Sequence, residues 1–449
     1  MLFNSVEFVV FFLVFFATFF ILKTTRQQLI FIAVASLYFY SAWNPWYVLL
    51  LLVTCMLAFP AQEGKFSRSM AIALLLGLLF YFKYYNFATA QLLSLGVDLG
   101  RLSVADVALP VGISFYVFHA ISLIVDRSRG IVPPTRLIPL ISYIAFFPQL
   151  IAGPIVRAHT FVPQLQLPRV FNARMFRSGM LLFAIGMFKK LVIADNVGVF
   201  VDSVYDSHGA TTAANHIVAF YLYAIQIYFD FCGYSDMAIG IARALGFRFP
   251  ANFARPYLSA SITEFWRRWH ISLSTWLRLY LYIPLGGNRK GPVRTYINLM
   301  LVMLLGGLWH GAAWTFVFWG GIHGLGLAIE RATGYAPESI WRRRVGIFIT
   351  FHLVCISWVF FRAPDILSAW AYFKGMADVD SILIVTTKFA VAKCAMLTGL
   401  FLILEHFATT RSFLKLRNMR VLLPVGIAYA ILFLLLANFA AHPFIYFQF

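Results

Sequence analysis

Long apolar runs constrain this chain more than any other feature of its sequence. They lie at residues 5–22, 28–42, 46–60, 69–88, 110–126, 178–200, 214–232, 296–308, 312–329, 345–361, 382–404 and 420–440. A helix that crosses a bilayer needs about 20 predominantly apolar residues, and several of these runs are too short to cross alone. We therefore predict an all-helical, polytopic membrane protein with about eleven transmembrane helices, supplemented by re-entrant and interfacial helices.

The composition agrees with this prediction. Of 449 residues, 61% are hydrophobic and only 12% are charged, against roughly 25% charged residues in soluble domains. This balance excludes a secreted soluble enzyme, a disordered scaffold and a DNA-binding domain. No internal repeat is visible, and no stretch leaves room for a soluble domain, so residues 1–449 are expected to form one integral membrane domain.

The charges predict an orientation. The net charge is +19, and basic residues cluster between the apolar runs, for example at Lys65 and Arg68 and at residues 342–344. Cytoplasmic loops carry such an excess of Lys and Arg. By alternation, both termini are expected on the outer, periplasmic side. The four cysteines are far apart, with no zinc-like spacing, so we expect neither a disulfide framework nor a metal site.

Residues 246–294 differ from the rest, because they are basic and aromatic without a spanning apolar run. Ser261 and Glu264 have the spacing of a capping box. Four apolar residues then follow at helical spacing: Phe265, Trp269, Leu273 and Trp276. We predict one interfacial helix here, on the cytoplasmic face. A plain amphipathic anchor explains the pattern equally well. Pro148 and the Gly153-Pro154 pair indicate a further irregular segment, which we predict to be re-entrant.

Ionisable residues inside apolar runs are costly and mark candidate sites. His310 and His323 lie within residues 296–330, among small residues that permit close approach of another backbone or an extended substrate. They are about 20 Å apart if the path is one helix, so they need not meet. Histidine suits acyl transfer because it exchanges a proton near neutral pH. The other candidates are His119, Asp126, Lys189, Lys190, Asp230, Asp236, His270, His352 and Glu405.

Asp230 and Asp236 are either a carboxylate pair or, more in keeping with their surroundings, structural polar contacts or proton-path residues. The sequence holds no G-x-S-x-G elbow, Walker A loop, H-E-x-x-H motif or dinucleotide fingerprint.

One block of sequence carries a family resemblance. Residues 262–274 read ITEFWRRWHISLS, followed by WLR at 276–278 and YIPLGGNR at 282–289. Further segments occur in matching order: LPVGISF at 109–115, FPQ at 147–149, GP at 153–154, FCGYSD at 231–236, and WHG at 309–311 through HG at 323–324. The chain resembles the membrane-bound O-acyltransferases over nearly its whole length, and within them the bacterial branch that contains the alginate O-acetyltransferase membrane subunit.

The resemblance implies a ring of helices around a thinned centre, with funnels open to both sides. It implies that His323 is the catalytic histidine and that His270 is a second functional histidine near the cytoplasmic side. The matched segments supply a supporting and tunnel-lining set: Trp269, Trp309, His310, Arg278, Asn288, Ser235 and Asp236.

The implied reaction moves an acetyl group from a cytoplasmic donor, acetyl-CoA, toward an exported polysaccharide such as alginate or cellulose. No bound cofactor is expected, and separate extracytoplasmic proteins would complete the transfer at a bacterial inner membrane. Basic residues of the signature can attract the phosphates of the donor, although positive-inside anchoring explains the same charges. They are Arg267, Arg268, Arg289 and Lys290, together with Arg278.

Two positions depart from the family pattern, since Leu279 stands where an Asp is usual and His119 where a Gln is expected. An acyltransferase for peptidoglycan or teichoic acid is a near alternative. A transporter of polymeric or lipid-linked sugar fits the composition and span count equally well, although the inverted repeats of many transporters are not visible. An inactive scaffold of an export complex is a third alternative, which Leu279 leaves open.

Overall fold

The structure is a computed structural model that describes residues 1–100, 107–151, 153–207, 211–378 and 430–438, together with residues 392, 396, 399 and 444. This part of the chain is helical and contains no strand. Each of the first ten apolar runs coincides with helix, as predicted. The runs at 382–404 and 420–440, and Glu405 with them, lie largely outside the described residues.

The first group of helices runs from α1 to α5: α1 (Val6–Ile21), α2 (Thr25–Ser41), α3 (Tyr47–Gln62), α4 (Arg68–Ser94) and α5 (Ile113–Ser128). The side chains of Ser5, Thr24 and Ser67 cap the first amides of α1, α2 and α4, which satisfies donors that a helix start leaves unpaired. Aromatic rings then hold the group together. Phe147 contacts Phe15 and Phe39 at ring-centroid distances of 5.0 and 5.4 Å.

Short helical pieces follow: α6 (Leu137–Ile144), α7 (Phe147–Leu150), α8 (Ala158–Phe161) and η2 (Val162–Leu165). This is the irregular segment that the Pro and Gly breaks indicated. Protein groups satisfy its backbone: the Phe147 amide donates to Ser36 Oγ at 3.1 Å, and the Ile155 amide donates to Ser272 Oγ at 2.9 Å. Non-helical backbone at membrane depth requires such partners.

Three longer helical segments follow in the chain. They are α9 (Ala173–Met187), which runs through the π-helical turn η3 (Phe188–Ala194) into α10 (Asp195–Tyr205), and the long α11 (Ala213–Ala244). Helices α9 and α11 pack so closely that a Cβ on Gly179 would lie 2.5 Å from the Gly240 carbonyl oxygen. Glycine therefore sets how near the two backbones can come.

The π-helical turn brings two lysines against α11. Lys189 Nζ lies 2.6 Å from Asp236 Oδ2. Lys190 Nζ lies 2.7 Å from both Asp195 Oδ1 and Asp230 Oδ1. Asp230 and Asp236 thus pair with different lysines, which corresponds to the predicted structural contacts rather than to a carboxylate pair.

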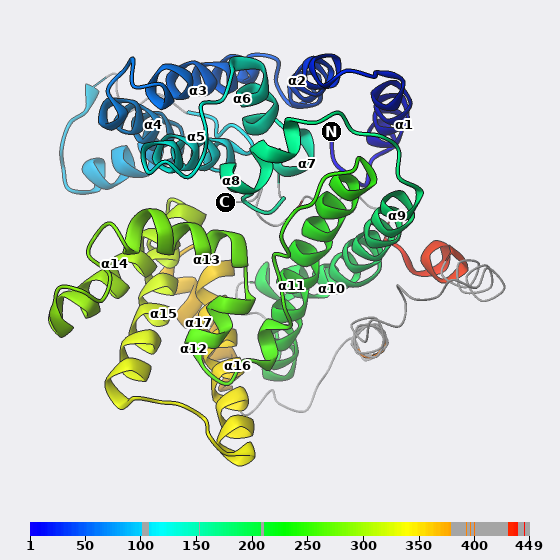
Figure 1. Cartoon of the computed structure of the whole chain (residues 1–449). Helices are drawn as coiled ribbons and strands as arrows, with labels where there is room; N and C mark the ends of the chain where they lie inside the picture. The colour runs from blue at the N-terminus through cyan, green and yellow to red at the C-terminus, as the bar shows by residue number, and fades with distance from the viewer. Residues whose placement is uncertain are drawn as a thin grey trace.

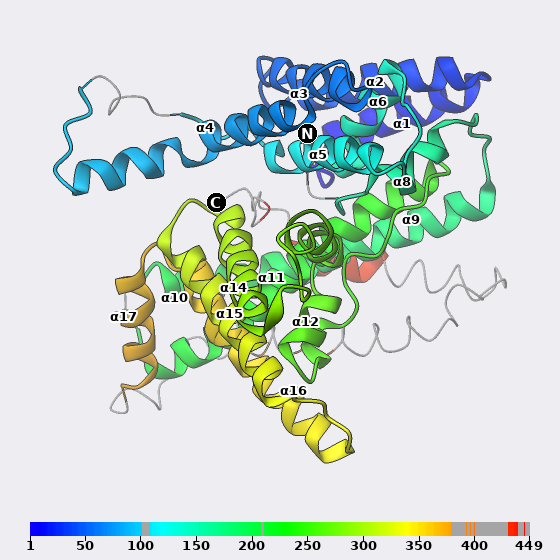
Figure 2. The ribbon, with the colours of Figure 1, turned by 60° about the vertical axis from the view of Figure 1, so that its left-hand side comes forward.

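The last group contains η4 (Pro256–Leu258), α12 (Ile262–Arg268), α13 (Ile271–Leu277), η5 (Arg278–Tyr282), α14 (Gly291–His310), α15 (Trp314–Thr333), α16 (Ile340–Arg362) and α17 (Ile366–Met376). Figures 1 and 2 show α12–α17 as a group apart from α1–α8, and in Figure 1 α9–α11 lie to the right of the gap between these groups.

Within the described ranges, four helices have the length and apolarity of a membrane span: α4, α11, α14 and α16. The apolar helices α1 and α3 are shorter. These helices indicate a multi-pass membrane protein, while eleven spans and a closed ring stay predictions.

Candidate active site

The signature segment is not one helix, so that prediction was wrong. Helix α12 ends at Arg268, His270 adopts a left-handed backbone with φ 41° and ψ 54°, and α13 begins at Ile271. An L-residue in this conformation costs about 1–2 kcal/mol. Backbone from another segment compensates at the break: the Ile271 amide donates to the Asn252 carbonyl at 2.9 Å, and the Ala254 amide donates to the Arg268 carbonyl at 2.9 Å.

The predicted apolar face of this segment is nevertheless buried. Phe265, Trp269 and Leu273 are 0% exposed and Trp276 is 6% exposed. The same side-chain spacing therefore serves two short helices as well as one long one.

The break holds the His270 ring in one orientation. Its Nδ1 lies 3.2 Å from Asn252 Oδ1, and the Ser272 amide donates to the same oxygen at 3.3 Å. Because the backbone N–H of Ser272 can only donate, the Asn252 side-chain atom that it faces is the acceptor oxygen. The His270 nitrogen that faces the same oxygen, Nδ1, therefore carries the proton. The Asn252 amide group donates in turn to Ser235 Oγ at 3.0 Å. His270 Nε2 is buried and has no hydrogen-bond partner in the described structure.

His323 is held in a comparable way from the neighbouring helix. Its Nε2 lies 3.0 Å from Ser357 Oγ on α16. The single hydroxyl proton of Ser357 goes to the Val354 carbonyl at 2.7 Å, so Ser357 Oγ accepts from His323 Nε2–H. His323 Nδ1 then carries a lone pair, and this buried nitrogen has no partner among the described residues.

A series of touching rings links the two histidines. His323 contacts Trp319 at 4.9 Å between ring centroids, Trp319 contacts His310 at 5.1 Å, His310 contacts Trp309 at 5.0 Å, and Trp309 contacts His270 at 6.1 Å. We call these five residues the ring path. The sequence allowed His310 and His323 to be far apart, but the turn between α14 and α15 brings both against Trp319.

Glycines on α14 and α15 let the two helices pack closely against each other. A Cβ on Gly307 would overlap the Phe316 carbonyl oxygen, and a Cβ on Gly320 would overlap the Met303 carbonyl oxygen. The small residues predicted to permit close approach thus admit another backbone. Lys83 of α4 fixes the end of α14, since its ammonium donates to the carbonyls of Trp309 and His310, and a cation is favourable at a helix C-terminus.

Carboxylates tie α12 to α15 and α16. Glu330 of α15 accepts from the first amides of α12, at Ile262 and Thr263. Ser261 Oγ accepts from the Glu264 amide at 3.0 Å as predicted. However, the Glu264 carboxylate accepts from the Ala260 amide at 2.7 Å, one residue before the cap. The segment therefore uses a shifted form of the capping box.

The Glu264 carboxylate is also paired with two arginines, Arg268 at 2.6 Å and Arg343 at 2.9 Å. Burial raises the pKa of this carboxyl. The Ala260 amide and the guanidinium groups of Arg343 and Arg268 outweigh that effect, so its pKa lies below the usual value. Glu264 is therefore ionised at neutral pH.

A cavity of about 1120 Å³ lies beside these elements. Its lining carries four arginines against two carboxylates: Arg267, Arg278, Arg331 and Arg343, with Glu264 and Glu330. Asn288 and Trp266 also line it. The Trp266 ring lies 5.3 Å from that of His323, so one side chain contacts both the cavity and the ring path. The lining suits a large anionic ligand.

The predicted site residues lie partly around the ring path and partly around the cavity. Trp269 packs on Trp358 and Phe265 beside the ring path, and Ser235 supports His270 through Asn252. Three of the basic residues proposed for the donor do not line the cavity. Arg268 pairs with Glu264, Arg289 donates to the Ile283 carbonyl at 3.4 Å, and the Lys290 chain covers Gly286.

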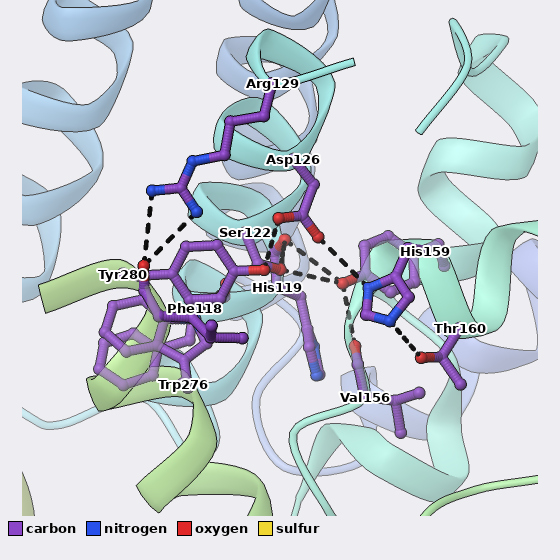
Figure 3. A network of polar contacts seen from close by, with 12 residues as sticks. Phe118, His119, Ser122, Asp126, Arg129, Val156, His159, Thr160, Trp276 and Tyr280 are labelled. Carbon is purple, nitrogen blue, oxygen red and sulfur yellow. Dashed lines mark hydrogen bonds and ion pairs between the residues drawn. The ribbon is translucent and has the colours of Figure 1, made fainter. Parts of the chain in front are cut away.

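Figure 3 shows what surrounds the departure at Leu279. Arg129 donates to the Leu279 carbonyl at 3.4 Å, and Tyr280 Oη donates to Asp126 Oδ1 at 2.7 Å. Asp126 also lies 3.6 Å from His159. Asp126 of α5 is thus the carboxylate beside η5, and it binds Tyr280 rather than Arg278. Arg278 makes no ion pair within the residues that the structure describes.

Sequence reasoning missed four residues of this arrangement. Asn252 and Ser357 fix the histidine rings, Lys83 fixes the end of α14, and Trp319 joins His310 to His323. Lys83 alone gave a signal, as a basic residue inside the apolar run at 69–88. In the described residues, no group of three His, Cys, Asp or Glu is placed to hold a metal ion.

Comparison with known proteins gives this geometry a context. The family model described as membrane-bound O-acyltransferase family matches residues 134–366. A "Probable alginate O-acetylase" of Pseudomonas putida is 43% identical over 383 residues, which cover 82% of this chain and 78% of that protein.

Two further relatives carry other names. The "Peptidoglycan O-acetyltransferase" of Helicobacter pylori is 35% identical over 427 residues, or 85% of this chain and 81% of that protein. A "Teichoic acid D-alanyltransferase" of Bacillus subtilis is 28% identical over 268 residues, or 56% and 68%. The matched region includes both histidines and the cavity, and the chain belongs to the membrane-bound O-acyltransferase family.

Proposed function

We propose that this chain is the membrane subunit of a polysaccharide O-acetyltransferase. In this proposal it takes an acetyl group from acetyl-CoA on the cytoplasmic side and passes it on for O-acetylation of an exported polysaccharide such as alginate. The observation that carries the proposal is the ring path, in which two tautomer-fixed histidines each keep a buried, unpaired nitrogen, and Trp266 joins His323 to the basic cavity. The similarity to alginate O-acetylases supports the choice of acceptor.

The cavity is proposed as the donor site. Arg267, Arg278 and Arg331 lie in its lining and can bind phosphate groups of coenzyme A by charge-assisted hydrogen bonds. Trp266 contacts both the cavity and His323, so the acyl end of a donor held there has a short route to that histidine.

His323 is proposed as the general base. Its Nδ1 removes the proton of an acceptor hydroxyl as the hydroxyl oxygen attacks the thioester carbonyl carbon. A C–O bond forms, the C–S bond breaks, and the proton passes to the thiolate, which gives an ester and a free thiol. His270 is proposed to orient the donor or to assist the proton transfer.

The proposal includes a location. The chain would lie in a bacterial inner membrane with the cavity on the cytoplasmic side and both termini periplasmic, where extracytoplasmic proteins would receive the acetyl group. A reporter that is active only in the cytoplasm, fused after Phe449, should be inactive. Activity of that reporter would contradict this topology.

The first experiment measures acetate released by mild base from exported polysaccharide. A deletion strain is complemented with wild type, His323→Ala or His352→Ala, at matched membrane abundance. Loss of a positioned base costs about 10²- to 10⁴-fold in rate, so His323→Ala should restore no measurable acetate. His352 is the control, because its ring is held by Tyr221 and Phe348 outside the ring path.

Each other outcome has a definite meaning. Full acetylation with His323→Ala would remove His323 from the chemistry. Polymer missing from the surface of the deletion strain would instead favour the transporter.

Peptidoglycan is the second candidate acceptor, because the Helicobacter pylori relative is covered over 81% of its length. Acetate on muropeptides, rather than on polysaccharide, of the complemented strain would select it.

A further inference from the structure

Four tryptophans around the histidines have buried indole N–H groups without an acceptor in the described structure. They are Trp266, Trp269, Trp309 and Trp319. The other two buried tryptophans are paired: Trp276 donates to the Phe118 carbonyl and Trp358 donates to Tyr257 Oη, each at 3.2 Å. The unpaired indoles are therefore confined to the surroundings of the ring path.

Such a group of atoms is unusual in a native protein. Buried donors are nearly always hydrogen-bonded, because an unpaired one loses its hydration without compensation. Apolar rings of the same shape would avoid this cost. Four unpaired donors, next to two imidazole nitrogens that are also unpaired, indicate a place where a ligand supplies acceptors.

Two of these indoles flank the proposed base. Trp319 and Trp266 meet the His323 ring at centroid distances of 4.9 and 5.3 Å, with interplanar angles of 63° and 76°. Phe265 lies nearly parallel to the same ring, at 5.8 Å and 14°. Two unpaired indole donors therefore lie against the imidazole of His323, while Phe265 offers no polar atom.

We infer that the indole N–H groups of Trp319 and Trp266 bind the carbonyl oxygen of the transferred acyl group. This inference rests on the proposed function. When the acceptor oxygen adds to the carbonyl carbon, the C=O electron pair moves to oxygen, and the indoles donate to that oxyanion. The pair returns as the C–S bond breaks, and the proton held by His323 passes to the leaving thiolate. Donors fixed in advance stabilise such an oxyanion without reorganisation.

The first test compares Trp319→Phe, Trp266→Phe and Trp358→Phe in membrane vesicles of the complemented strain. The full chain and its own partners are then present. The initial rate of thiol release is measured against acetyl-CoA concentration, and thermal unfolding is measured on the solubilised protein. All three changes replace an indole by a smaller phenyl ring, but only Trp358→Phe removes a hydrogen bond that the protein itself makes.

The two kinds of tryptophan should respond in opposite ways. Removing one oxyanion donor costs about 10²- to 10³-fold in kcat. Trp319→Phe and Trp266→Phe should each lose that much, with a far smaller change in KM and a melting temperature no lower than that of Trp358→Phe. Trp358→Phe should unfold at a lower temperature than wild type and keep its kcat within a few-fold.

A second readout follows the carbonyl itself. The infrared stretch of isotope-labelled acetyl-CoA bound to His323→Ala protein should move to higher frequency when Trp319→Phe is added, because a hydrogen bond to the carbonyl is lost. An unchanged stretch together with wild-type kcat in Trp319→Phe would overturn the inference. If His323→Ala is inactive in that case, the proposed function survives. If His323→Ala is fully active, the assignment of His323 as the base fails. If vesicles with the wild-type chain release no thiol, the proposed function fails.

Discussion

Asn252 decides which nitrogen of His270 is available for chemistry. Its side-chain oxygen accepts from His270 Nδ1, and its amide group is held by Ser235. Ser357 does the same for His323 through the opposite nitrogen. A tautomer is therefore fixed for each histidine by a neutral, buried neighbour, and no charged partner is required.

Asn252→Ala should lower acyl transfer by about 10- to 100-fold, because His270 then has no fixed tautomer and general acid–base catalysis is lost in part. Thiol release in membrane vesicles measures this. Asn298→Ala is the control, since Asn298 is a buried amide that donates to the Gly287 carbonyl instead. Equal losses in both variants would show that Asn252 acts on stability alone.

Glu264 makes a pH prediction. Its pKa is lowered from 4.5 in the fold, so its contribution to stability is fully present above that value and is lost as pH falls through the lowered pKa. The melting temperature of the solubilised Glu264→Gln protein should therefore be lower than that of wild type at pH 7. The deficit of this variant should shrink as the pH falls below 4.5 and through the lowered pKa. A deficit that is constant with pH would contradict the ion-pair role.

At the scale of elements, the sequence predicts the buried face of α12 and α13 but not the break between these two helices. The apolar spacing at residues 265–276 is that of one continuous helix, and all four predicted side chains are buried. The break arises from Asn252 and Ala254, whose backbone bonds to residues on either side of it. A contact between distant segments leaves no periodic pattern, so local reasoning could not find it.

The α14–α15 pair makes the prediction at this scale. Gly307→Ala should destabilise the protein by about 1–3 kcal/mol, as overpacking does, because its Cβ would overlap the Phe316 carbonyl. Gly321→Ala should be close to wild type, since its Cβ would meet only Leu304 at 3.7 Å. Thermal unfolding of both variants tests this. A tolerated Gly307→Ala would mean that the helices can separate freely.

At the scale of the whole molecule, ten apolar runs correctly predicted helices, and the signature block correctly predicted the family. Their arrangement was not accessible. Composition does not state that a lysine of α4 caps α14, or that Trp319 joins two histidines, because both facts depend on tertiary packing. Of the five basic residues predicted to attract the donor, Arg267 and Arg278 line the cavity and three do not, because charge can be read from a sequence while position in the fold cannot.

The cavity makes a prediction at this scale. Arg267→Ala with Arg278→Ala should raise the KM for acetyl-CoA at least about tenfold, the effect expected from losing hydrogen bonds to charged groups, and should leave kcat nearly unchanged. The increase should diminish at high salt, where exposed charges are screened. Arg289→Ala, outside the lining, is the control. An unchanged KM in the double variant would place the donor elsewhere.

The ring path has a consequence for the membrane as a barrier. A charge that crosses an energised bilayer releases about 2.3 kcal/mol per 100 mV, so any enzyme that serves both faces risks a leak. The aromatic rings of this path are buried and in contact, so they give ions no continuous water to follow. The same residues that are proposed to handle the acyl group would thus also act as electrical insulation, and catalysis would not discharge the membrane.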